Sequence, residues 1–557
     1  MMQAKIWHPH YDAHVPKALI YPHITLIDLL NNSASKFPEK SCCLYQGIDY
    51  SYHTINSITT HLAKILIHLG LNVGDRVGVL FPNSPSFIMA YFATLKAGGI
   101  VVAINPRYTG YEIEEMVKTS QLKWFICLRE LKNVIDPITT KYKIRAVVFA
   151  DLLNHIELFP SNRPRKEYGE LRKDLGIYEL SDLMNSKIPD NVLPDVNFNS
   201  PAIFQYTGGT TGTPKAAIGL HRNLVANTQQ FIAWCDLHVG QETILTAIPL
   251  YHVYGMVLTM CLGIALGARL LLISDPRDIG EILSQIQKYR PTFFPGVPNM
   301  YYAITQHPDV REGGISLDSI KACISGSSPL HAEVKHQFEA LTGGRLMEGY
   351  GLSEAPTSTH CNPLYGANKT GSIGLPLPDV DCRIVDLESG AHDVDIGEVG
   401  ELIIKGPQVM KGYYQMPDED KITLRADWLY TGDVARMDEE GYFYLIDRKK
   451  SLIKVGGLQV WPNEVEKIIC EHPTVADAGV GGVPDMTRGE KVIAWVMLKA
   501  NQITNQDEIQ KWCKKKLVSY KIPAEIIIVD QLPRTSVGKI LKRKLISEYQ
   551  QKKEPDD

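Results

Sequence analysis

Short apolar runs alternate with amphipathic segments along most of the chain. A strand is predicted over 76–81 (RVGVLF), a helix that ends at glycine over 85–98, and a second strand over 99–105. Similar units recur over 231–250 and over 279–297. A repeated strand–helix–strand order is typical of parallel, doubly wound α/β structure, which is the fold class that we expect for the large N-terminal part.

The pattern changes after Gly371. The runs DCRIVD and GELIIKG predict short strands between turns, and hence a small β-rich subdomain. A second boundary lies at 445–457, where three consecutive basic residues separate two predicted strands. Helices predicted over 463–472 and 505–518 then alternate with strands, which indicates a compact α+β module of about a hundred residues.

Composition narrows the class of protein only slightly. A chain of 557 residues exceeds one hydrophobic core, and its apolar content of 44% is ordinary for a soluble protein. The net charge of −4 gives no reason to expect nucleic acid as a partner. The ten cysteines include no CxxC pair and no zinc-like spacing, which favours a reduced, cytoplasmic setting with buried thiols.

One apolar segment, 255–274, is long enough to cross a bilayer. It contains Arg269 and three glycines, so we interpret it as a buried helix followed by a strand rather than a span. The N-terminal residues do not follow the pattern of a signal peptide, and the C-terminal residues carry no lipidation box or peroxisomal address. We therefore expect no transmembrane span.

The stretch QYTGGTTGTPKAA, residues 205–217, is predicted to be a loop between two strands. Its glycines let backbone amides approach a ligand, its threonines add hydroxyl donors, and Lys215 adds a positive charge. A polyphosphate fits this chemistry. The loop is not a Walker A motif, because Pro214 precedes the lysine and Ala216 follows it. The alternative is a flexible polar turn.

The segment MEGYGLSEA (347–355) offers a second set of nucleotide-binding groups. Tyr350 is suited to stack on a purine, Ser353 to bond a phosphate, and Glu354 to hold Mg²⁺ through oxygen. A Gly-Tyr-Gly turn is weak support by itself, since it also occurs as plain turn structure.

Three further residues are candidates with equally plain alternatives. Asp433, in LYTGDVA, is predicted to lie in a tight turn, where its carboxylate could accept both ribose hydroxyls or serve only the turn. His252 lies among aromatic residues, where a histidine is more often a core residue than a catalyst. Lys539 follows a glycine in a basic tail that could be merely a solvated face.

Taken together, these motifs resemble those of the adenylate-forming acyl-CoA ligases. The resemblance runs from about Ser51 to Leu545, with the motifs in the family's order. It is strongest to the bacterial long-chain fatty-acid CoA ligases, through YTGGTTG, DWLYTGDVARMDEEGYFYLIDRKK and VWPNEVE. It implies that a fatty acid of medium to long chain attacks Mg·ATP to give acyl-AMP and pyrophosphate, and that coenzyme A then displaces AMP.

The resemblance also assigns roles to residues. The catalytic set is Lys539, Glu354, His252 and Lys454, with Glu354 as the metal ligand. The nucleotide-binding set is Thr207, Gly208, Gly209, Thr210, Thr211, Gly212, Lys215, Gly349, Tyr350, Gly351, Ser353, Asp433 and Arg448. Lys454, Gly456 and Gly457 are implied to serve coenzyme A, and the acyl-binding set is His252, Val253, Tyr254, Val297, Gly326 and Ser327.

The domains implied are an N-terminal domain over 1–446, a hinge over 447–450 with Lys450 as the hinge residue, and a small, mobile α+β C-terminal domain over 451–557 that carries the catalytic lysine. Long-chain relatives are often dimers, so the resemblance is compatible with a homodimer, and peripheral contact with the inner membrane face is left open.

Two departures from the long-chain pattern keep alternatives open. Gly456 stands where the long-chain branch usually has Ser, and Ser451 where it usually has Asp. An aryl or short-chain acyl-CoA ligase is therefore an alternative, as is an adenylating enzyme that loads a carrier protein. A non-catalytic nucleotide or lipid scaffold is the third hypothesis, which the presence of Lys539, Glu354 and Asp433 disfavours.

Overall fold

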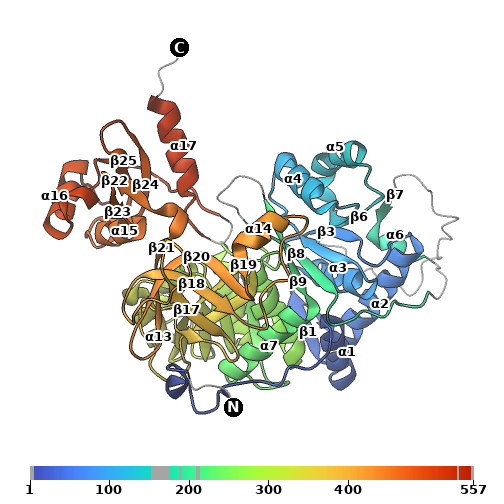
Figure 1. The fold of residues 1–557 in the computed structure, drawn as a ribbon. Coiled ribbons are helices and arrows are strands. Elements are labelled where there is room, and N and C mark those ends of the chain that lie inside the picture. Colours follow the sequence, from blue (N-terminus) through green and yellow to red (C-terminus); the bar gives the residue numbers. More distant parts are fainter. Residues whose placement is uncertain (1–4, 152–175, 187–190, 208–213, 536–537, 554–557) are drawn as a thin grey trace. The chain divides into compact units, whose positions relative to one another are not determined.

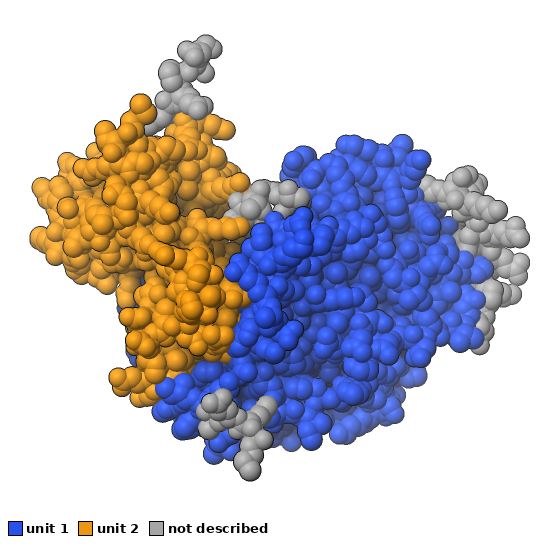
Figure 2. Space-filling view, viewed as in Figure 1, with its two compact units in different colours: residues 1–381, 405–429 blue, residues 382–404, 430–557 orange. Residues whose placement is uncertain are grey.

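The protein is described here by a computed structural model that covers residues 5–151, 176–186, 191–207, 214–535 and 538–553. The chain forms two compact units (Figure 2). Unit 1 comprises residues 1–381 and 405–429, and unit 2 comprises residues 382–404 and 430–557.

Unit 1 contains a seven-stranded sheet in the order β7-β6-β5-β3-β4-β8-β9. Figure 1 labels β3, β6, β7, β8 and β9 of this sheet. All neighbours are parallel except the last pair, β8 and β9. The strands are β3 Arg76–Leu80, β4 Ile100–Ala103, β5 Trp124–Leu128, β6 Ala146–Ala150, β7 Gly176–Glu179, β8 Pro201–Thr207 and β9 Lys215–Leu220. The predicted strand–helix–strand unit is confirmed, with α3 over Pro85–Lys96 between β3 and β4.

A nine-stranded sheet in the order β16-β15-β14-β13-β12-β10-β11-β1-β2 forms the other half of unit 1. Its central strands are parallel and its two edges are antiparallel. The strands are β1 Ser41–Tyr45, β2 Ile48–Ser51, β10 Thr243–Thr246, β11 Arg269–Leu272, β12 Phe293–Gly296, β13 Ala322–Ser325, β14 Arg345–Leu352, β15 Ala355–Cys361 and β16 Leu375–Pro376.

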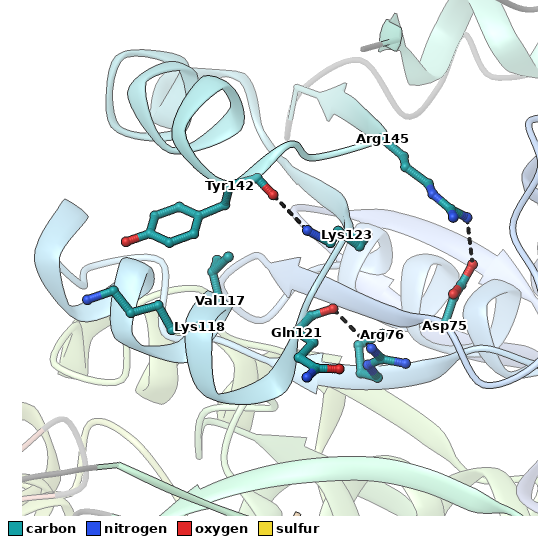
Figure 3. A pocket seen from close by; sticks show the side chains of 8 residues that line it. All are labelled: Asp75, Arg76, Val117, Lys118, Gln121, Lys123, Tyr142 and Arg145. Carbon is teal, nitrogen blue, oxygen red and sulfur yellow. Dashed lines mark hydrogen bonds and ion pairs between the residues drawn. The ribbon is translucent and has the colours of Figure 1, made fainter. Parts of the chain in front are cut away.

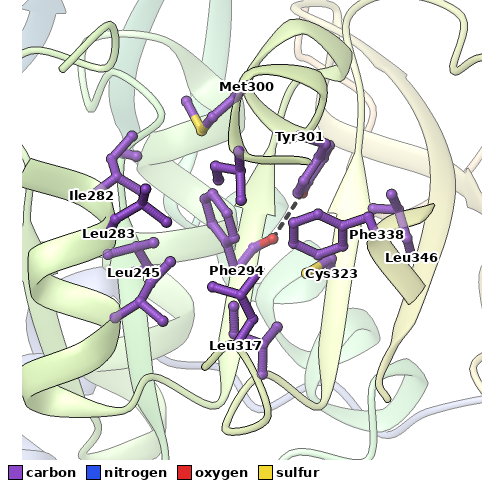
Figure 4. Packing of buried hydrophobic residues seen from close by; sticks show 14 of the residues in the cluster. Leu245, Ile282, Leu283, Phe294, Met300, Tyr301, Leu317, Cys323, Phe338 and Leu346 are labelled. Carbon is purple, nitrogen blue, oxygen red and sulfur yellow. Dashed lines mark hydrogen bonds between the residues drawn. The ribbon is translucent and has the colours of Figure 1, made fainter. Parts of the chain in front are cut away.

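Amphipathic helices supply the cores of unit 1. In α10, Asp278 caps the first turn by accepting from the amide of Glu281, and Ile282, Leu283 and Ile286 are buried. These side chains pack with those of β10, β12, β13, α11 and α13 in one cluster (Figure 4). The longer helices of unit 1 are α1 Leu26–Lys36, α2 Tyr52–His68, α4 Gly110–Ser120, α5 Lys132–Tyr142, α7 His221–Trp234, α10 Ile279–Tyr289, α11 Pro298–Gln306 and α13 Ala332–Thr342.

Short elements complete unit 1. They are α6 Leu180–Met184, α8 Val253–Gly255, α9 Leu262–Leu266, α12 Pro308–Arg311, α14 Pro417–Thr423 and β19 Leu424–Arg425. The apolar segment 255–274 is a buried π-helical turn over Met256–Cys261, then α9 and β11, which confirms the predicted helix followed by a strand. Among the described residues, no helix has both the length and the apolar character needed to span a membrane.

Unit 2 holds the predicted β-rich subdomain and the α+β module. The first consists of most of β17 Asp381–Val385, β18 Gly400–Lys405 and β20 Trp428–Met437, with β21 Phe443–Arg448. The second is a five-stranded sheet, β23-β22-β25-β24 with β26 on β25. Its elements are β22 Ile453–Val455, β23 Leu458–Val460, α15 Pro462–Cys470, β24 Val475–Asp485, β25 Gly489–Leu498, α16 Gln506–Lys516, β26 Glu525–Ile528 and α17 Lys542–Lys553.

The prediction that Asp433 lies in a tight turn is wrong. Residues 428–437 form one ten-residue strand, β20, and Asp433 pairs with Arg448 of β21. Gly432 has a φ of +70°, and the register shifts between Val434 and Ala435. The Thr-Gly-Asp run therefore marks an irregular point within a strand, because the glycine relieves the backbone there without ending the pairing.

Candidate functional site

The strands that flank the Gly/Thr stretch form an antiparallel hairpin. Thr207 at the end of β8 pairs with Lys215 at the start of β9, which confirms the predicted loop between strands. Five predicted ligand residues of this loop lie outside the described residues, namely Gly208, Gly209, Thr210, Thr211 and Gly212. Lys215 is described, and its side chain is only 11% exposed.

Ser353 and Glu354 occupy the tip of a second hairpin. Leu352 of β14 pairs with Ala355 of β15, so the two candidate residues are the whole turn. Gly351 is required just before it, because a Cβ there would lie 1.7 Å from the carbonyl oxygen of Thr357. The close approach of two backbones explains this glycine, and it fixes how the tip projects from the sheet.

Tyr413 connects these two hairpins. Its hydroxyl donates to Glu354 Oε1 at 2.7 Å, and the Lys215 ammonium lies 5.5 Å from the centroid of its ring. Lys215 also forms an ion pair with Glu419 of α14. Tyr413 is held beside β9 by a bridge to Ala217 and by the bond from the Tyr414 amide to the Ala216 carbonyl. The structure therefore brings the predicted phosphate lysine and the predicted magnesium ligand to one tyrosine.

The protonation of Tyr413 suits this role. Burial, together with the Glu354 carboxylate, raises the pKa of its phenol well above the usual range. The phenol therefore keeps its proton and acts as the donor to Glu354. Sequence reasoning missed Tyr413, because the run KGYYQMPDED has no motif chemistry and its partners lie far away in the chain.

The Gly-Tyr-Gly run lies within β14 rather than in a turn, and its tyrosine is largely buried. Tyr350 lies in β14 with 9% of its surface exposed, and its ring meets His360 edge-on at 5.9 Å. Gly349 faces Ile324 of β13, with 3.1 Å from a Cβ to the Ile324 methyl. The remaining exposed part of Tyr350 limits any contact with a base to a small area.

The predicted acyl-binding segments meet at Tyr254. Its hydroxyl lies 2.9 Å from the carbonyl oxygen of Gly296 and 2.6 Å from that of Ile324, at the ends of β12 and β13. A Cβ on Gly326 would lie 3.2 Å from the same ring. Val297 and Ser327 directly follow Gly296 and Gly326, and Val253 is buried beside Tyr254.

His252 is partly buried and neutral at physiological pH. Its Nδ1 accepts from the amide of Tyr254 at 3.2 Å, and burial lowers the pKa of the imidazole to about 4. An accepting Nδ1 leaves the proton on Nε2. The imidazole can therefore donate one hydrogen bond, to a carboxylate for example, without carrying a charge.

In unit 2, the predicted ribose, phosphate and catalytic residues cluster. Arg448 Nε lies 3.0 Å from Asp433 Oδ1, and the Asp433 side chain is 8% exposed. Lys539 lies near enough for this pair to act on it. Desolvation of its ammonium group and the Arg448 charge lower its pKa to about 8, against the opposite effect of Asp433. Three residues predicted from separate motifs therefore share one electrostatic environment.

The predicted coenzyme A residues lie at a different turn of unit 2. Val455 pairs with Leu458, so Gly456 and Gly457 form a two-residue hairpin turn, with φ of +59° and +82°. Such turns require positive φ at both positions, which accounts for both glycines. Lys454 is exposed, its amide donating to Glu490 at 2.7 Å. Lys450, the predicted hinge residue, is exposed in a short 3-10 turn.

Glu354 is the sole candidate metal ligand, and no group of three or more His, Cys, Asp or Glu side chains is placed to hold a metal within the described part of the chain. A single carboxylate fits Mg²⁺, which usually binds through one or two carboxylates plus substrate phosphates. None of the ten cysteines, all of which are described, forms a disulfide, and all but Cys470 are buried, as predicted for small apolar side chains.

Comparison with known proteins finds two family models that match the chain. Residues 30–414 match the family model described as AMP-binding enzyme, and residues 464–539 match the model described as AMP-binding enzyme C-terminal domain. The chain is 39% identical over 562 residues to a long-chain-fatty-acid–CoA ligase of Bacillus subtilis, covering 98% of this chain and 99% of that protein. It is 34% identical over 556 residues to one of Yersinia pestis, covering 98% of each.

Solved structures show the same fold. ATP-bound MatB from Rhodopseudomonas palustris matches with a TM-score of 0.82 and 27% identity, over 94% of this chain and 99% of that chain. The O-succinylbenzoate coenzyme A synthetase MenE of Bacillus subtilis, solved with ATP and magnesium ion, matches with a TM-score of 0.78 and 23% identity, over 93% and 98%. The second likeness concerns the fold alone.

Proposed function

The chain belongs to the AMP-binding enzyme family, and from this premise we propose that it activates a medium- to long-chain fatty acid with ATP and transfers it to coenzyme A. It is an AMP-forming acid–thiol ligase. The products are acyl-CoA, AMP and pyrophosphate.

One observation carries the proposal. Lys215 and Glu354 come from hairpins that are far apart in sequence, yet both contact Tyr413. A lysine beside a loop rich in amides and a carboxylate at a hairpin tip suit a triphosphate with its divalent cation. A scaffold with no nucleotide would have no need to hold both groups on one tyrosine.

In the proposed first step, a carboxylate oxygen of the fatty acid attacks the α-phosphorus of ATP. A new P–O bond forms, the bond to the β-phosphate oxygen breaks, and pyrophosphate leaves. Two anions must meet, so cationic groups have to offset their repulsion and the charge that develops in the transition state. We assign that role to Lys539, between the acyl carboxylate and the α-phosphate. Glu354 would hold Mg²⁺, which supplies further charge neutralisation at the phosphates.

In the proposed second step, the sulfur of coenzyme A attacks the acyl carbonyl carbon. The C–O bond to AMP breaks, AMP leaves, and the thiol proton passes to solvent or a base. Lys454 and the Gly456–Gly457 turn are assigned to coenzyme A, with open space at both glycine Cβ positions. His252 is assigned to the acyl carboxylate through its Nε2 proton, and the hinge at Lys450 remains a prediction from the resemblance.

The direct test is pyrophosphate release across carboxylic acids from acetate to oleate, with aryl acids included. The proposal expects the highest kcat/KM for medium or long chains and a thioester with coenzyme A. A preference for aryl or short acids, or thioester formed only on a phosphopantetheinylated carrier protein, would replace the proposed substrate or acceptor. The predicted homodimer and membrane contact are checked separately, by solution mass and by vesicle flotation.

The catalytic role assigned to Lys539 can be tested by a substitution at that residue. Lys539→Ala is expected to abolish acyl-AMP formation while ATP binding remains measurable. Lys544→Ala is the matched control, since Lys544 is exposed in the same basic tail and has only a 3.8 Å contact with Glu548. Unchanged adenylation in Lys539→Ala would remove this lysine from the mechanism.

A further inference from the structure

A cavity of about 450 Å³ lies in unit 1, and none of its lining residues is among those assigned above (Figure 3). Three of its lining residues stand where parallel strands begin: Arg76 starts β3, Lys123 precedes β5 and Arg145 precedes β6. Lys118 comes from the end of α4, and Tyr142 from the end of α5. The cavity therefore sits at the amino edge of the seven-stranded sheet.

The position separates this cavity from the predicted phosphate loop. Residues 208–213 follow the carboxyl end of β8, which runs parallel to β4 and therefore to β3. The amino and carboxyl ends of parallel strands lie at opposite edges of a sheet, and the nucleotide sites of doubly wound folds lie at the carboxyl edge. A ligand in the cavity would occupy a second site.

Two of the cations in the cavity are held by neutral groups. The Arg76 guanidinium donates to the carbonyl oxygens of Gly74, Ser120 and Gln121 at 2.9, 2.9 and 3.1 Å. Lys123 Nζ donates to the carbonyl oxygen of Tyr142 at 2.7 Å. Neither side chain has a carboxylate partner among the described residues, so backbone dipoles fix both cations in place without cancelling their charge.

The other charges of the lining do not restore neutrality. Arg145 reaches Asp75 only at 3.7 Å, and Lys118 is paired with Glu115 of its own helix. Asp75 is the one carboxylate among the eight lining residues, against four cations. Figure 3 shows the ends of Arg145 and Asp75 approaching each other on one side of the cavity, with Lys118 and the Tyr142 ring on the other.

We propose that this cavity binds a small molecule that carries a phosphate group. Its volume falls in the range of small-molecule sites, about 300–1,000 Å³. Preorganised cations favour compact oxyanions, because guanidinium and ammonium groups form charge-assisted hydrogen bonds with phosphate oxygens. The Tyr142 ring offers an apolar wall for the body of such a molecule. The inference goes beyond the ligase activity and does not depend on it.

Inorganic pyrophosphate is the probe, titrated into the full chain by calorimetry at low ionic strength, where exposed charges are least screened. The test variant is Arg145→Gln with Lys118→Gln, because both side chains are exposed and neither bonds a backbone carbonyl of the cavity wall. The proposal expects the variant to bind one fewer pyrophosphate than the wild type, or to bind it at least tenfold more weakly at that site.

Comparison between the two proteins isolates the cavity, because both keep the same nucleotide site. If the proposed ligase function failed, the wild type would show one site and the variant none, so the difference of one would remain. Lys132→Gln is the matched control, since Lys132 is exposed on α5, is paired with Asp136 and does not line the cavity. Lys123→Gln provides a second removal of charge from within the lining.

Equal stoichiometry and equal affinity in the wild type and the double variant would overturn the proposal. A loss of the same size in Lys132→Gln would also overturn it, because the effect would then follow net charge rather than the cavity.

Discussion

Replacing Tyr413 with Phe is the sharpest test of how the site is held together. The change deletes the hydroxyl that donates to Glu354 at 2.7 Å and keeps the ring that faces Lys215 at 5.5 Å. The variant therefore separates the orientation of the predicted magnesium ligand from the position of the predicted phosphate lysine. The carboxylate of Glu354 stays, but it loses the donor that fixes its direction.

The expected magnitude follows from the kind of bond. A hydrogen bond to a charged group contributes about 1.5–3 kcal/mol. Glu354 is only half-buried, so water can replace part of the lost donor, which places the effect near the lower limit. About 1.5 kcal/mol corresponds to roughly a tenfold loss. We expect this loss in kcat/KM for MgATP, measured by pyrophosphate release, together with a higher Mg²⁺ requirement.

Tyr414→Phe is the matched control. Its hydroxyl donates to Gln121 Oε1 at 3.1 Å, away from Glu354 and Lys215, so its kinetics should stay within about twofold of wild type. Tyr413→Leu should lose about a further few-fold, because the ring contact with Lys215 also disappears. Wild-type kcat/KM for MgATP and wild-type Mg²⁺ dependence in Tyr413→Phe would refute the role given to this tyrosine.

Three other outcomes are expected. With the pKa of Lys539 lowered to about 8, kcat/KM for adenylation should fall as pH rises through about 8, whereas the contribution of this lysine to the free energy of unfolding should rise between about pH 8 and 10.5. The variant Lys539→Arg keeps its charge and should lack the fall in rate. A pH profile identical to that of the wild type would contradict the assignment. Gly351→Ala should lose adenylation and about 1–3 kcal/mol of stability, because the new Cβ would lie 1.7 Å from the carbonyl oxygen of Thr357. Gly110→Ala is the control and should be tolerated, because the nearest atom to its Cβ would be 3.8 Å away. Thermal unfolding measures the stability of each variant, and turnover measures its activity. Cys361→Ser should keep its activity while losing about 1–3 kcal/mol on chemical denaturation, because the buried thiol is a packing group; complete loss of adenylation in the folded variant would contradict this.

The fold was largely predictable because the pattern of apolar and polar residues along the chain follows which positions are buried. Strands such as β3 and β4 are buried on both faces, so they appear as continuous apolar runs in the sequence. In the apolar segment 255–274, individual polar and glycine residues distinguish a helix followed by a strand from a membrane span. Arg269 begins β11 at its half-buried end, and Gly267 ends α9 in a left-handed conformation. Both features identify a helix that stops and a strand that follows.

The predicted turn at Asp433 was wrong for a physical reason. A Thr-Gly-Asp run supplies the same local signals whether the chain reverses or only bends within a strand, because glycine permits positive φ in both. Strand β20 stays continuous because it pairs with β21, where Asp433 lies opposite Arg448. The Thr431 hydroxyl also donates to the carbonyl oxygen of Leu402 at 2.7 Å. Those partners are not visible in the local sequence.

Tyr413 marks the same limit for the site. Motif chemistry identifies groups that touch a ligand, because those groups must have particular donors or charges at fixed spacing. It does not identify the residue that holds two such groups in place, since any side chain with a ring and a donor could do so once the backbone brings it there. Here the backbone does so through the bridge of Tyr413 to Ala217, two residues after Lys215. The predicted magnesium ligand and the predicted phosphate lysine are thus positioned by pairing beside β9. A change that disturbs this pairing should impair nucleotide binding even though it touches no predicted ligand residue.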